Sequence, residues 1–245
     1  MSWVRSRTVE VYLGSTTVGC RGLDDLGDRW AEASRLDAGL ARLGEWMAGS
    51  ADPLRARVWL GAGLARPLVV APGSGARNAR EARELASALA ADVTGLGDEL
   101  KVWLAPWRAG RTTLAVAIPQ PLLASLRALA GARRGQRVVS VRPWWNQVLD
   151  AAIERSRTGA RSIGWTVAEP DGLVQGRIVS GEVAEAAFEA PRTHDPDGAL
   201  IRRRLEIGWG DLDEVEHLVF RPAATNPERY AVGGAEGVQR VEAVE

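Results

Sequence analysis

The sequence predicts an α/β protein made of mixed sheets flanked by helices. Short segments in which apolar and polar residues alternate are interspersed along the chain with segments whose apolar residues recur every three or four positions. Two strand-and-turn segments, 9–16 and 161–166, stand in the two halves of the chain. We therefore expect a first lobe at residues 1–156 with an inserted hairpin-helix subdomain, a small or truncated second lobe at 157–222, and a flexible tail at 223–245.

Composition indicates an ordinary soluble protein with a real core. The chain has 245 residues, of which 46% are hydrophobic and 25% charged, and its formal net charge is zero. A chain with no net charge lacks the excess of basic residues that is typical of a nucleic-acid-binding protein. The single cysteine, Cys20, excludes an intramolecular disulfide. No signal peptide is visible, and the longest uncharged segment, 112–126, is too short to span a bilayer. We expect a cytoplasmic protein without a membrane span.

The sequence lacks the residues that several enzyme classes require. Lys101 is the only lysine, so there is no GxxxxGK[ST] phosphate loop, and it has no kinase-like VAIK context. The two histidines offer little for catalysis or metal binding, because His194 lies in a turn-forming run and His217 opens an apolar strand. We predict no catalytic residue and no metal site.

In the first half of the chain, residues 9–20 predict a hairpin around the turn at 14–17. Asp28 then suits the cap of a helix, whose stripe is Trp30, Ala33, Leu36, Leu40, Leu43 and Met47. Strands at 56–60 and 67–71 follow, joined by a Gly-Ala-Gly turn. The helix expected at 78–93 has an inward face of Ala82, Leu85, Ala86 and Leu89.

The next segments predict a hairpin at 102–106 and 113–118, a helix from Pro121 to about residue 132, a strand at 137–141 and a helix at 145–155. The second lobe begins with strands at 162–168 and 174–179, which flank a strong turn signal at 169–173. A strand at 183–189, a short helix at 199–207 and a strand at 217–220 complete it. From Pro222 onward the chain has few large apolar residues.

The two strand-and-turn segments resemble the phosphate loops of actin-type ATPases without their aspartates. In a DxG[ST] turn, backbone amides approach the phosphates while the Asp holds hydrated Mg²⁺ or a water. Here Tyr12 and Ser162 stand at the Asp positions, beside Gly14, Ser15 and Gly164. Neither side chain is a hard anionic ligand at neutral pH, so we expect no ATP or magnesium cofactor.

Residues 114–119, the leucine-rich helix after them, and the segments 139–145 and 149–151 carry a family resemblance. The chain resembles PilM/GspL-type actin-like cytoplasmic proteins of type IV pilus and type II secretion systems, over about residues 7–190 and best over 55–155. These proteins pass from a strand ending in Val-Pro through a helix to a strand ending near Pro, and then into a helix that crosses to the second lobe.

The resemblance implies two RNase H-like (actin-like) lobes that serve as an adaptor for proteins of an inner-membrane platform. Two departures matter. Tyr12 and Ser162 break the nucleotide motifs that the PilM branch keeps, and this sequence shows no membrane helix of the GspL kind. The family's adenosine-contacting Gly-Gly is also missing after the late strand, since Gly233 and Gly234 lie in the tail. The expectation is a non-catalytic, pseudo-ATPase scaffold, cytoplasmic or peripheral to the inner membrane.

Ten tryptophans, against two tyrosines and two phenylalanines, are the other unusual feature. Trp59, Trp103 and Trp165 fall within strands and are expected in the core. Trp144 and Trp145 are neighbours whose side chains point about 100° apart in a helix. Two interpretations stay open: one of the two rims the inter-lobe cleft or contacts a partner, or both are buried at the lobe junction, which is the interpretation we favour. Beside them, Arg142 suits an anion in the cleft or an ion pair with a nearby carboxylate.

Two other functions stay open. One is an RNase H-like metal-dependent nuclease that uses Glu10 with Asp171 or Asp213, although it would need converging carboxylates and a basic groove. The run Arg202-Arg203-Arg204 is more typical of a solvated helix face than of such a groove. The other is a nucleotide-binding or small-molecule-binding ATPase or kinase relative. A deep polar pocket between the lobes would distinguish that protein.

Overall fold

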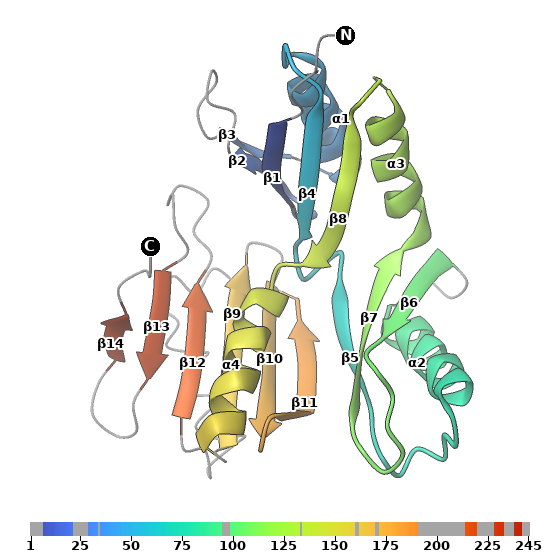
Figure 1. Cartoon of the computed structure of the whole chain (residues 1–245), viewed down its shortest axis with the longest axis vertical. Helices are drawn as coiled ribbons and strands as arrows, with labels where there is room; N and C mark the ends of the chain where they lie inside the picture. The colour runs from blue at the N-terminus through green and yellow to red at the C-terminus, as the bar shows by residue number, and fades with distance from the viewer. Residues whose placement is uncertain are drawn as a thin grey trace, which may run out of the picture.

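The computed structural model describes residues 7–21, 29–33, 35–94, 99–132, 134–159, 162–169, 172–190, 214–219, 228–232 and 238–241. Within these segments the strands form sheets of five, three and six strands. Figure 1 shows the five-stranded sheet above the other two, which lie side by side beneath it. The predicted class, mixed sheets flanked by helices, is confirmed.

The five-stranded sheet has the order β3-β2-β1-β4-β8. Its strands, in that order, are Arg29–Glu32, Thr17–Arg21, Arg7–Leu13, Leu54–Leu60 and Arg137–Pro143. The predicted first hairpin is confirmed as β1 and β2, which are antiparallel, whereas β1, β4 and β8 run parallel. Helices α1 (Leu36–Ala48) and α3 (Gln120–Gly131) pack together and contribute to the same buried core as these strands.

The helix expected after Asp28 begins later than its apolar stripe predicts. Trp30 lies in strand β3, which pairs with β2, and α1 starts at Leu36. Ala33 comes before the helix, and Asp28 lies outside the described residues. The three- and four-residue spacing of apolar residues continues from β3 into α1, although only the second of these elements is helical. Because β3 gains its hydrogen bonds from a neighbouring strand, tertiary pairing overrides the local pattern.

The three-stranded sheet has the order β5-β7-β6, with strands Arg66–Val70, Thr113–Pro119 and Leu100–Leu104. Its hairpin of β6 and β7 is confirmed as antiparallel. One face packs against α2 (Ala79–Thr94) through Ala82, Ala86 and Ala90, which are fully buried. The expected inward Leu89 is 37% exposed. Small side chains along the helix let it approach the sheet closely and leave Leu89 at the margin.

Helix α2 begins at a local hydrogen-bonded cap. The Asn78 carboxamide oxygen accepts from the backbone N–H groups of Arg80 and Glu81, and the Glu81 carboxylate accepts from the Arg77 N–H. These bonds satisfy amides that have no partner inside the helix. The cap explains why the predicted start near residue 78 is accurate.

The six-stranded sheet has the order β11-β10-β9-β12-β13-β14. Its strands are Glu182–Glu189, Gly172–Val179, Ser162–Glu169, Glu214–Val219, Glu228–Val232 and Val238–Val241. Helix α4 (Asn146–Gly159) packs against β9, β10, β11 and β12, as Figure 1 shows. The helix expected at 199–207 lies outside the described residues. Strands β13 and β14 lie within residues 223–245, where the sequence predicts a flexible tail. The lobe boundaries and the tail stay predictions.

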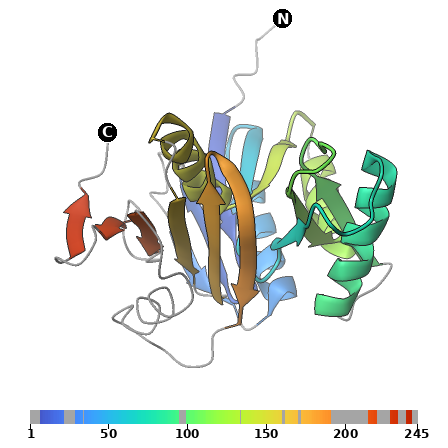
Figure 2. The same cartoon turned by 90° about the horizontal axis from the view of Figure 1, so that it is seen from below.

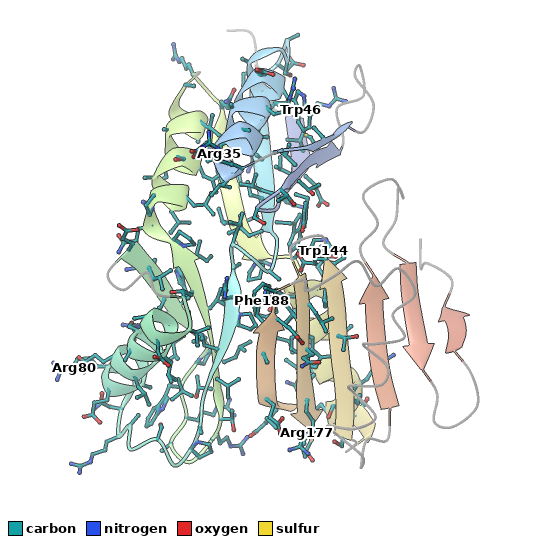
Figure 3. All side chains as sticks on the ribbon, turned by 180° about the vertical axis from the view of Figure 1, so that it is seen from behind. Arg35, Trp46, Arg80, Trp144, Arg177 and Phe188 are labelled. Carbon is teal, nitrogen blue, oxygen red and sulfur yellow. The ribbon has the colours of Figure 1, made fainter. Side chains whose placement is uncertain are left out.

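The three-stranded sheet is an insertion between β4 and β8. The turn after β4 leads the chain out of the five-stranded sheet, and α3 returns it from β7 to β8. Consequently the expected strand-helix-strand passage from β7 to β8 joins two different sheets. Seen from below (Figure 2), the insertion lies beside β11, where β5 and β11 contact. There the Arg66 guanidinium lies 4.4 Å from the centroid of the Phe188 ring, and Figure 3 shows Phe188 at this seam.

No helix in the described segments is long and apolar enough to cross a bilayer.

Candidate functional site

The ends of parallel strands from the two large sheets meet at one junction. Strand β8 points down toward the six-stranded sheet, and β9 and β12 point up toward the five-stranded sheet (Figure 1). Since β1 and β4 run parallel to β8, their carboxyl ends lie at the same edge. Ligands of α/β sheets bind outside the carboxyl ends of parallel strands. This junction is therefore the candidate site.

A buried hydrogen-bonded pair occupies the junction. The Tyr12 hydroxyl, near the end of β1, donates to Oε2 of Glu169, the last residue of β9, over 2.9 Å. The backbone N–H of Ala62 donates to the same carboxylate oxygen, also over 2.9 Å. Tyr12 is 5% exposed, Glu169 8% and Ala62 not at all. A side chain from each lobe and a backbone amide after β4 thus meet at one point.

Aromatic rings pack around this pair. The ring of Trp144 meets that of Tyr12 edge to face, with centroids 6.3 Å apart. Trp145 stacks on Trp165 of β9, with centroids 6.1 Å apart, and its indole N–H donates to the Ala65 carbonyl over 2.8 Å. These residues belong to a buried cluster that contains side chains of both lobes. Figure 3 shows Trp144 between the upper sheet and the six-stranded sheet.

The burial of Trp144 and Trp145 decides between the two interpretations of this pair. They are 5% and 0% exposed, so neither presents a surface to a partner. The interpretation with both buried at the lobe junction is confirmed. Both can be buried because the second ring faces β9 while the first faces Tyr12. Trp165 is also buried as expected, but Trp103, on the edge strand β6, is 43% exposed.

The two segments that resemble phosphate loops lie at different ends of their strands: Gly14 and Ser15 follow the carboxyl end of β1, whereas Ser162 is the first residue of β9. Ser162 begins β9 and Gly164 lies within it, whereas the residue that reaches Tyr12 ends the same strand. An eight-residue strand separates those ends. Tyr12 therefore meets Glu169 at the junction, and Ser162 lies at the opposite end of the same strand. On the first lobe, Gly14 and Ser15 do follow β1, and the Gly14 N–H donates to the Thr17 carbonyl within the turn.

Glu169 is the site residue that sequence reasoning missed. It stands directly before Pro170-Asp171-Gly172, a turn signal at the end of an alternating strand. Tyr12 stands two residues before Gly14-Ser15, because Leu13 is the last residue of β1. Both polar side chains thus lie within two residues of a turn that follows a strand, which is the signal that could have drawn attention to Glu169.

Arg142 of β8 lies near enough to Asp150 of α4 for its charge to act on that carboxyl group. Partial burial raises the pKa of Asp150 above its usual range, and the positive charge of Arg142 counteracts part of that increase. Arg142 is exposed. Both interpretations of Arg142, an anion in the cleft or an ion pair with a carboxylate, stay predictions.

The residues proposed for a nuclease do not form a site within the described segments. Glu10 lies 3.8 Å from the Arg57 guanidinium on the surface of the first sheet. Asp171, Asp213, His194 and the arginine run at 202–204 lie outside the described residues, and His217 lies in β12. No group of three or more histidines, cysteines or carboxylates within the described chain is placed to hold a metal.

Two lobes joined through opposed strand ends, with an inserted subdomain on the first, define an actin-like fold. The chain is similar to a Bacteroides thetaiotaomicron protein with an actin-like ATPase fold and unknown function, with a TM-score of 0.53 and 11% identity over 84% of this chain and 78% of that one. At such identity the likeness shows the fold.

Two more solved structures are similar at lower scores. One is the cytoplasmic domain of EpsL, an inner-membrane component of the type II secretion system of Vibrio cholerae, with a TM-score of 0.43 and 16% identity over 75% of this chain and 71% of that one. The other is the PilM–PilN type IV pilus biogenesis complex, with a TM-score of 0.49 and 12% identity over 83% of this chain and 66% of that one. No family model and no curated protein matches the chain.

Proposed function

We propose that this chain is a non-catalytic scaffold with an actin-like fold, which contacts protein partners of a type IV pilus or type II secretion-like inner-membrane assembly from the cytoplasmic side. The observation that carries the proposal is the hydrogen bond between Tyr12 and Glu169. It lies at the carboxyl ends of the parallel strands, where a ligand of such a fold is expected.

The chemistry of the junction supports the absence of turnover. Nucleotide hydrolysis of this type uses carboxylates to hold a hydrated cation near the phosphates. Here the Glu169 carboxylate accepts bonds from a tyrosine hydroxyl and a backbone amide. The Tyr12 and Trp144 rings lie against each other beside it. A phosphate and its cation would have to displace a buried polar bond and the packed rings together.

The assignment to a pilus or secretion platform rests on the sequence resemblance of residues 55–155. That segment includes the insertion, α3 and β8, which together form much of the first lobe. In this protein, packed side chains fill the position where such a fold would bind its ligand. The outer surface of the framework therefore remains available for function. Partner binding is the function that such a surface supports.

Isothermal titration with Mg-ATP and Mg-ADP, together with a phosphate-release assay, tests the non-catalytic part. We expect no binding at millimolar nucleotide and no turnover above that of Tyr12→Ala and Glu169→Ala variants measured in parallel. Micromolar binding by the wild type, or turnover that either variant abolishes, would overturn the proposal. That result would favour the nucleotide-binding relative instead.

Co-purification tests the partner. The tagged chain is expressed in its own host, and crosslinked complexes are compared with those of a tagged unrelated protein of similar size. We expect inner-membrane platform proteins of a pilus or secretion machine to be enriched. Enrichment of nucleic-acid-processing proteins alone, with none of the platform, would contradict the assignment while leaving the nucleotide result unaffected.

A further inference from the structure

A groove separates the inserted subdomain from the second lobe, away from the Tyr12–Glu169 junction. Three elements line it: the loop between β6 and β7, helix α4, and the turn between β10 and β11. Its volume is about 490 Å³, within the range of small-molecule sites.

The groove has an apolar floor and a polar, mainly cationic rim. Leu149 and Val183, 1% and 8% exposed, lie at its base together with the partly buried Leu114 and Ile153. The charged lining residues are Arg108, Arg111, Arg157, Asp150 and Glu182. Arginines therefore outnumber the acids by three to two. The more buried position of the aliphatic residues gives the groove a dry base below charged walls.

Hydrogen bonds and ion pairs hold the walls in place. Arg111 of the β6–β7 loop forms a salt bridge with Glu182 of the β10–β11 turn, so it joins the two sides. That turn uses two residues of positive φ, Ser180 at 52° and Gly181 at 77°, a conformation typical of tight hairpins. The Gly181 N–H donates to the Ser156 hydroxyl of α4 over 3.0 Å. A groove with fixed walls binds a ligand with less ordering cost.

The charged residues of the groove differ in whether an oppositely charged side chain lies beside them. Glu182 pairs with Arg111, and Arg157 lies 3.2 Å from Glu154. Asp150 is partly buried, and this burial raises the pKa of its carboxyl group above the usual range, although the charge of Arg142 opposes the shift. Arg108 forms no ion pair with another described residue and is exposed on the rim. Its guanidinium presents a planar fork suited to a carboxylate, phosphate or sulfonate.

We propose that this groove binds a small amphipathic organic anion, whose acidic group pairs with Arg108 at the rim and whose apolar body rests on Leu149, Ile153 and Leu114. The charge of the rim selects the acidic group, and the aliphatic floor selects the body. Arg111 provides a second cation once the ligand competes with Glu182 for it. The proposal does not depend on the proposed scaffold role, because no residue that lines the groove takes part in the Tyr12–Glu169 hydrogen bond.

Anilinonaphthalene sulfonate is a suitable probe, since it combines an acidic group with an apolar body and fluoresces when its surroundings are dry. We expect the full chain to bind one equivalent. Arg108→Glu should weaken that binding at least about tenfold, because it replaces a charge-assisted hydrogen bond by repulsion. Arg134→Glu, the same change on an exposed loop before β8, should leave it unchanged.

An uncharged analogue, phenylnaphthylamine, tests the role of the acidic group and should bind at least about tenfold more weakly than the sulfonate. Near-ultraviolet circular dichroism confirms that each variant is folded, and Arg108→Ala provides a milder second variant. The proposal is overturned if the sulfonate does not bind, if Arg108→Glu binds it as the wild type does, or if the neutral analogue binds equally well. Whether nucleotides bind at the Tyr12–Glu169 junction does not affect any of these outcomes.

Discussion

The Tyr12 hydroxyl and the Glu169 carboxylate form a 2.9 Å hydrogen bond that links the end of β1 to the end of β9. They lie 157 positions apart in the sequence. Both are buried, and the Ala62 amide shares the same oxygen. The bond fastens the two lobes at the position where an actin-like ATPase would need space.

Tyr12→Phe removes the hydroxyl donor and retains the ring that packs on Trp144. We expect the free energy of unfolding to fall by about 1–3 kcal/mol, because the buried carboxylate loses a hydrogen-bond donor. Urea unfolding measures the change. A double-mutant cycle with Glu169→Gln isolates the pair, and additive effects within about 0.5 kcal/mol would show that the two residues are not coupled.

Trp145→Phe tests the second contact between the lobes. It keeps an aromatic ring beside Trp165 but removes the indole N–H that donates to the Ala65 carbonyl. We expect a loss of about 1–3 kcal/mol, because that carbonyl is buried, and a reduced near-ultraviolet signal from the stacked pair. Trp103→Phe, on an exposed edge strand, is the matched control and should change stability by no more than about 0.5 kcal/mol. Equal effects of the two changes would contradict the structure.

Gly176→Ala tests the packing inside the six-stranded sheet. An added Cβ at Gly176 would stand 2.5 Å from both the Trp165 Nε1 and the Glu185 carbonyl oxygen. Neither atom can move away easily, because Trp165 Nε1 belongs to a buried ring and the Glu185 carbonyl belongs to a paired strand. We expect destabilisation of about 1–3 kcal/mol or more. Gly73→Ala, where nothing lies within 4 Å, is the control. A variant at 176 as stable as the wild type in thermal unfolding would be inconsistent with this contact.

Asp150→Asn tests the effect of partial burial on a carboxyl group. The folded-state pKa of Asp150 is raised, chiefly by burial and despite Arg142, so the folded protein holds this proton more tightly than the unfolded chain. The wild type therefore loses stability as pH rises through the unfolded and then the folded pKa. The asparagine variant lacks this dependence. It should be equal or slightly more stable at neutral pH, by less than about 1 kcal/mol because the group is partly exposed.

Unfolding measured from pH 3 to pH 7 checks this prediction. The stability difference between Asp150→Asn and the wild type should move in favour of the wild type as the pH falls. A difference that moves the opposite way would mean that Arg142 outweighs burial. Glu45→Gln, on an exposed face of α1, is a control for the removal of one surface carboxylate.

Local patterns predicted the elements where local interactions determine them. The hairpins of β1 with β2, β6 with β7 and β9 with β10 each have an alternating pattern and a turn signal, and each is present. Helix α2 begins at the side-chain cap formed by Asn78. The start of α1 was missed because β3 depends on pairing with β2, which the spacing of Trp30 and Ala33 does not reveal.

The sequence by itself determined the alternation of strands and helices, the inserted subdomain and the tyrosine, in place of a carboxylate, at position 12, because propensity, turn chemistry and side-chain identity are local properties. Only the tertiary structure decided that Glu169 meets Tyr12, that Trp144 and Trp145 are both buried, and that β13 and β14 extend the second sheet. Those outcomes depend on which surfaces remain to be covered after the sheets pack, and residues far apart in the chain cover them.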